Sequence, residues 1–158
     1  MRHDNVEEAA ESYRLAAEGH PGGAEAATLW HQAGETYAYA MNRAQARVCF
    51  RQALTLNGSR ASTYRALAGL AEDDAREQVH AALNGTSATV QDYLTHARDA
   101  LAEALQCYVG AATLDPDEAL MRHLSRLHRW LAMDGTPQAR LTRGELEAPR
   151  LAGDYGEE

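Results

Sequence analysis

Two thirteen-residue stretches of this chain follow the same pattern, 58 residues apart. Residues 46–58 read ARVCFRQALTLNG, and residues 104–116 read ALQCYVGAATLDP. Both stretches have Ala, Cys, an aromatic residue, Ala and Thr-Leu at the same positions. Self-similarity of this kind is the signature of repeat proteins, in which one supersecondary unit buries its apolar face against the next.

The segments that precede these stretches also match, but at a different interval. Trp30 and Tyr37 recur 34 residues later as Tyr64 and Ala71. Since the later landmarks recur after 58 residues, 24 extra residues lie around the turn at 84–87. They add about 12 residues to each helix of the second pair, or about 18 Å at the rise of an α-helix. The second helical hairpin is therefore expected to be much longer than the first.

A 3.6-residue apolar period predicts six helices and no strand, which is an all-α fold. The expected helices cover about residues 4–18, 24–41, 43–56, 60–83, 88–114 and 117–133. Asp4 is the expected N-cap of the first helix, and Asn57–Gly58 the expected left-handed stop of the third. Because the connections are short, neighbouring helices should pack antiparallel.

The stretch from Ala27 to Arg60 resembles a tetratricopeptide repeat. The residues that carry the resemblance are Trp30, Gly34, Tyr37, Ala46, Phe50 and Ala53. Ala33 replaces the usual Leu and Gly58 the usual Pro. The resemblance implies one helical domain over residues 1–135, stacked as a short superhelix. It would contain a half-repeat at 4–20, a repeat at 24–58, an extended repeat at 60–116 and a capping helix at 117–133, followed by a polar tail at 136–158.

Tetratricopeptide arrays bind a peptide or helix of a partner in a concave groove, lined by the first helix of each hairpin. By this resemblance, the groove residues of the first repeat are Thr28, His31, Glu35 and Tyr39. Those of the second are Ser62, Arg65, Gly69, Glu72 and Asp73. The family's mode of binding C-terminal carboxylates depends on lysines, and this chain has none.

Charge and composition narrow the expected partner. All fifteen basic residues are arginine, which excludes lysine chemistry such as a Schiff base and agrees with a GC-rich bacterial genome. A net charge of −8 disfavours nucleic acid and favours a basic protein partner. No apolar run approaches the roughly 20 residues of a membrane span, so we expect a soluble, cytoplasmic protein without membrane partners. Cys49 and Cys107 are expected to be small buried hydrophobes, not a disulfide framework.

Catalytic and metal-binding patterns are sparse. Glu77 and His80 have the Glu-x-x-His spacing of di-iron bundles, but such sites need a second copy and two further glutamates. There is no nucleophile-elbow, phosphate-loop or dinucleotide motif. The chain is therefore not expected to be an enzyme or to hold a cofactor.

Two further features bear on binding. Arg122, Arg126 and Arg129 form a basic stripe on the last helix, which is either a solvated face or a grip for a partner's carboxylates. The tail is expected to be free or to dock in a groove, and an exposed apolar end would favour a homodimer.

The leading interpretation is an interaction scaffold. The alternatives are a peptide- or ligand-sensing regulatory domain and, third, a metal-dependent bundle enzyme.

Overall fold

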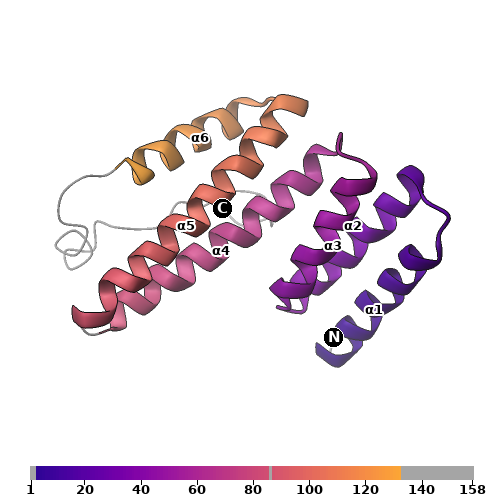
Figure 1. Ribbon diagram of the computed structural model, residues 1–158, viewed down its shortest axis with the longest axis horizontal. Coiled ribbons are helices and arrows are strands. Elements are labelled where there is room, and N and C mark those ends of the chain that lie inside the picture. Colours follow the sequence, from indigo (N-terminus) through magenta and orange to yellow (C-terminus); the bar gives the residue numbers. More distant parts are fainter. Residues whose placement is uncertain (1–2, 86, 133–158) are drawn as a thin grey trace. The chain divides into compact units, whose positions relative to one another are not determined.

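The computed structural model describes residues 3–85 and 87–132, and within them the protein has six α-helices and no strand. The helices are α1 (His3–Gly19), α2 (Gly23–Tyr39), α3 (Arg43–Leu56), α4 (Ala61–Asn84), α5 (Ser87–Leu114) and α6 (Glu118–Leu131) (Figure 1). The all-α fold expected from the apolar period is confirmed, and each helix begins and ends within two residues of its expected bounds. The polar tail at 136–158 lies outside the described residues.

The chain divides into two compact units, Met1–Leu70 and Ala71–Glu158, with the boundary inside α4. The first unit contains α1, α2, α3 and the first part of α4, and the second contains the rest of α4 with α5 and α6. A single domain over 1–135 stays a prediction.

In the first unit, α2 packs against both α1 and α3. Alanines line these contacts, since Ala10, Ala27, Ala33, Ala46 and Ala53 are all at most 1% exposed. Small side chains let helix backbones approach closely, and the Phe50 ring of α3 lies over Gly34 of α2. A Cβ at position 34 would be 2.7 Å from two carbons of that ring.

The turns differ from expectation in two places. Neither Asn57 nor Gly58 has a left-handed backbone, since φ of Asn57 is −147° and the only described non-Gly residue with positive φ is Met41, at 64°. The left-handed stop predicted at Asn57–Gly58 is therefore wrong. The left-handed residue is instead Met41, in the turn between α2 and α3, and the next residue, Asn42, is the N-cap of α3.

The second helical hairpin, α4 and α5, is longer than the first, as the insertion predicts, but the added length is not shared equally and falls mainly on α5. α4 has 24 residues and α5 has 28, whereas α2 has 17 and α3 has 14. α6 packs on α5 through Leu120, Leu124, Leu127 and Trp130, and Arg98 of α5 donates to the carbonyl of Leu131 at 2.5 Å. None of the described helices carries an apolar stretch sufficient to traverse a lipid bilayer.

The two repeated stretches have closely similar burial. The pairs Ala46 and Ala104, Phe50 and Tyr108, and Ala53 and Ala111 are all at most 1% exposed. The cysteine pair differs, because Cys49 is buried and Cys107 is only half-buried. Neither cysteine forms a disulfide, and burial raises the pKa of Cys49 to about 11. The prediction of a buried hydrophobe thus holds for Cys49 and is wrong for Cys107.

Candidate functional site

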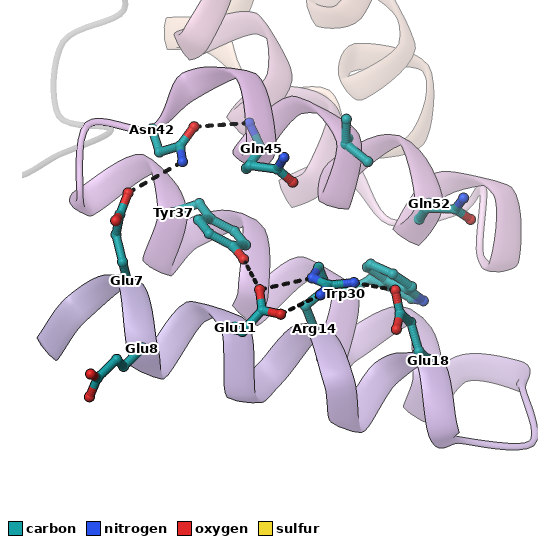
Figure 2. Close-up of a pocket in the computed structure, with 11 residues that line it drawn as sticks. Glu7, Glu8, Glu11, Arg14, Glu18, Trp30, Tyr37, Asn42, Gln45 and Gln52 are labelled. Carbon is teal, nitrogen blue, oxygen red and sulfur yellow. Dashed lines mark hydrogen bonds and ion pairs between the residues drawn. The ribbon is translucent and has the colours of Figure 1, made fainter. Parts of the chain in front are cut away.

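An open cavity of about 690 Å³ lies between α1 and α3, with α2 at its floor (Figure 2). One wall consists of the exposed face of α1, at Glu7, Glu8, Glu11, Arg14 and Glu18. The floor is formed by Trp30 and Tyr37. The other wall is Asn42 and the α3 side chains Gln45, Val48 and Gln52. We call this cavity the α1–α3 groove.

The helical period explains why each wall has its own chemistry. On α1, Glu11, Arg14 and Glu18 are three and four residues apart, and so are Gln45, Val48 and Gln52 on α3, which puts each set on one helix face. The neighbouring faces carry buried alanines, Ala10 and Ala17 on α1 and Ala46 and Ala53 on α3. The result is an acidic wall facing an amide wall.

Ion pairs organise the acidic wall. The Arg14 guanidinium donates to both carboxylate oxygens of Glu11 and also pairs with Glu18 (Figure 2). Tyr37 at the floor donates its hydroxyl to Glu11 at 2.7 Å. These donors, Arg14 first, lower the pKa of Glu11 to about 2, and Glu11 in turn raises the pKa of Arg14. Both groups are therefore charged at neutral pH.

Asn42 joins the two walls at one end of the groove. Its side-chain oxygen accepts from the backbone N–H of Gln45 at 3.3 Å, and its amide nitrogen donates to Glu7 at 3.3 Å. The cap of α3 thereby also positions a carboxylate of α1. Figure 2 places Glu7 and Asn42 at this end, and Glu18, Trp30 and Gln52 at the other.

The lining suits the binding of a cation. It contains four carboxylates and one guanidinium, a net charge of −3, together with neutral amides and two aromatic rings. Among these lining residues there is no Ser, Cys or His that could act as a nucleophile or base. Across the described part of the chain, no group of three or more His, Cys, Asp or Glu residues could hold a metal ion. Glu77 and His80 are both exposed on α4.

The groove residues predicted in the first repeat lie elsewhere, and none of them lines this cavity. Thr28 accepts from Arg60 at 3.0 Å, and Tyr39 is 74% exposed. His31 is buried, contrary to the expectation of a solvated lining. Its Nδ1 lies 2.9 Å from the Thr63 hydroxyl, and its Nε2 lies 3.3 Å from the Glu35 carboxylate. Burial, followed by the charge of Arg60, lowers the pKa of His31 to about 4.

The residues predicted in the second repeat are divided between the two units. Ser62 is exposed and accepts from Arg60 at 3.2 Å, and Arg65 is half-buried. Gly69 is buried, and Asp73 is half-buried. Glu72 is 0% exposed, so the expectation that it faces a solvated groove is wrong.

Glu72 instead belongs to a buried polar cluster that pattern reading missed. The Tyr108 hydroxyl of α5 donates to one oxygen of Glu72 at 2.5 Å, and His123 Nε2 of α6 lies 2.5 Å from the other. All three side chains are 0% exposed. The signal available in the sequence was the position of His123 beside the Leu120 and Leu124 seam, where a buried histidine needs a polar partner.

The basic stripe on α6 is exposed, as expected for a solvated face or a grip. Arg122 pairs with Glu118 at 2.9 Å, and Arg126 donates to His123 Nδ1 at 3.0 Å. Because a guanidinium can only donate, Nδ1 must accept, and the His123 proton lies on Nε2 and is donated to Glu72. Arg126 therefore contributes to the internal cluster as well as to the surface.

We compared the chain with protein-family models, with curated protein sequences and with solved structures, and none of the three comparisons gives a match.

Proposed function

We propose that this protein is an interaction module that binds a basic, extended segment of a partner protein in the α1–α3 groove. The observation that carries the proposal is the lining of that groove, with four glutamates and one arginine beside aromatic and amide side chains. Complementary charge guides encounter and selects partners, and amide side chains can hydrogen-bond a peptide backbone of any sequence.

Two features support this location over the surface first predicted from the family resemblance. The cavity exists without any rearrangement, whereas His31 and Glu72 of the predicted surface are buried. Arg14, Tyr37 and Asn42 fix Glu11 and Glu7 in place, so little side-chain freedom is lost when a ligand binds. A tetratricopeptide-like organisation belongs to the same proposal, and the matched burial of the repeated stretches supports it.

Selection from a displayed library of random dodecapeptides on the immobilised full-length protein tests the proposal. We expect enrichment of Arg and Lys, and affinities that fall as salt is raised, because exposed charges are screened. The variant E7Q/E8Q/E18Q should lose most of this binding. The matched control E35Q/E77Q/E118Q removes the same charge from residues that do not line the groove, and it should bind the selected peptides like the parent.

Two results would contradict the proposal. One is selection of acidic or uncharged peptides. The other is equal loss of binding in the groove variant and in the charge-matched control, which would mean that only the net charge attracts the peptides.

A further inference from the structure

The two ends of the α1–α3 groove differ in how far their carboxylates are already neutralised. At one end, Glu7 receives only the neutral amide of Asn42, and Glu8 has no ion-pair partner within the part of the chain that the structure describes. At the other end, Arg14 lies between Glu11 and Glu18 and pairs with both. The first end keeps a charge of −2, and the second a charge of −1 with a cation already in place.

From this asymmetry we infer that the bound segment places its basic residue at the Glu7–Glu8 end, and that Arg14 reserves the other end for an uncharged side chain. The inference rests on the proposed function and specifies its ligand. A second guanidinium close to Arg14 would meet a like charge, which costs about a factor of five in affinity at 4 Å even in bulk water. The Arg14 guanidinium thus already fills the position that a cation of the ligand would take at the second end.

The surface at the second end fits such a side chain. Trp30 is half-buried at the floor, and Val48 on the α3 wall is 51% exposed, so both have apolar surface left to cover. An aliphatic side chain placed there would remove this area from water. Figure 2 shows Trp30, Arg14 and Glu18 together at this end, away from Glu7 and Asn42.

The length of the groove sets the spacing of the two ligand residues. Glu7 and Glu18 are eleven residues apart on α1, which corresponds to about 16 Å of helix. An extended chain advances about 3.3 Å per residue, so about five residues cover this distance. The expected ligand therefore has a basic and a large aliphatic residue about five positions apart.

Three blocked hexapeptides test the inference by titration into the ¹⁵N-labelled full-length protein, followed by NMR chemical shifts. The probes are Ac-Arg-Gly-Ser-Gly-Ser-Leu-NH₂, its reverse Ac-Leu-Ser-Gly-Ser-Gly-Arg-NH₂, and the doubly basic Ac-Arg-Gly-Ser-Gly-Ser-Arg-NH₂. Net charge alone would make the doubly basic peptide the tightest. We expect the better of the two Arg/Leu peptides to bind at least three-fold tighter than the doubly basic one.

Variants assign the two ends. E7Q/E8Q should weaken the preferred Arg/Leu peptide roughly two- to thirty-fold, the range that loss of two exposed ion pairs gives, whereas E18Q should weaken it less than two-fold. R14Q should reverse the order, so that the doubly basic peptide becomes the tighter ligand.

Each outcome is informative. If the doubly basic peptide binds the parent more tightly, or if E18Q weakens binding as much as E7Q/E8Q, the division of the groove is overturned while recognition of basic segments stands. If none of the three peptides shifts any resonance of a groove residue at large excess, the proposed function fails together with the inference.

Discussion

At the scale of single residues, Gly34 and Phe50 set the distance between α2 and α3. The Phe50 ring is 1% exposed, and the centroid of the His31 ring lies 5.2 Å from its own, so it has little room to move. The repeat pattern marked both residues from sequence, because close helix contact requires a small residue opposite a large one.

Gly34→Ala should therefore destabilise the first unit. The added methyl gains about 1 kcal/mol in helix propensity but overpacks the ring at a cost of about 1–3 kcal/mol, so we expect a net loss of up to about 2 kcal/mol. Urea denaturation followed by circular dichroism measures it. Gly19→Ala is the matched control, since a Cβ there meets nothing within 4 Å and the change should not destabilise. A loss at Gly19 as large as at Gly34 would contradict the steric explanation.

His31 makes stability depend on pH. Its pKa is about 4 in the folded protein and 6.5 as an unperturbed group, so between these values the unfolded chain binds the extra proton. The contribution that neutral His31 makes to the free energy of unfolding is complete above pH 6.5 and is lost as the pH falls toward 4. The stability advantage of the parent over His31→Gln should shrink by about 2 kcal/mol between pH 7 and pH 4.5, as measured by urea denaturation at both values. An advantage that does not change with pH would show that His31 titrates normally.

At the scale of helices, the sequence predicted which helices exist and roughly how long they are. It predicted less well which face of each helix is buried and which is exposed. The apolar period and the 24-residue insertion gave six helices and a long second pair, because both depend on local spacing along one helix. Which face of α1 and α3 would border a cavity depends on how three helices pack, and no local spacing contains that information. Glu72 shows the same limit, since the partners that allow its burial, Tyr108 and His123, come from two other helices.

Asn42 connects an element boundary to the candidate site. Asn42→Ala should destabilise α3 by about 0.5–2 kcal/mol, because the backbone N–H of Gln45 loses its acceptor. Asn42→Asp retains the cap but places a carboxylate beside Glu7, so it should restore most of the stability without restoring the contact to Glu7. Thermal denaturation of the two variants separates the roles. If Asn42→Asp is as unstable as Asn42→Ala, capping is not the main contribution of Asn42.

At the scale of the whole molecule, each of the two units has one tryptophan and its own polar feature. Trp30 lies in the first unit with the groove, and Trp130 lies on α6 of the second unit with the Glu72 cluster. In that cluster the His123 imidazole connects the Glu72 carboxylate to the Arg126 guanidinium. Removing His123 or Tyr108 takes one donor away from the buried carboxylate of Glu72, which is more costly than losing a hydrogen bond at an exposed site.

His123→Ala should therefore destabilise the second unit by about 3–5 kcal/mol, through loss of a donor to buried Glu72 and loss of packing. Fluorescence of single-tryptophan versions, W130F for the first unit and W30F for the second, reports the two denaturation midpoints separately. Because the cluster lies wholly in the second unit, we expect the midpoint reported by Trp130 to fall more than that reported by Trp30. His128→Ala, on the exposed face of the same helix, should change either midpoint little. Equal shifts of the two midpoints in His123→Ala would mean that the chain unfolds as one cooperative body, in which the boundary inside α4 has no energetic counterpart.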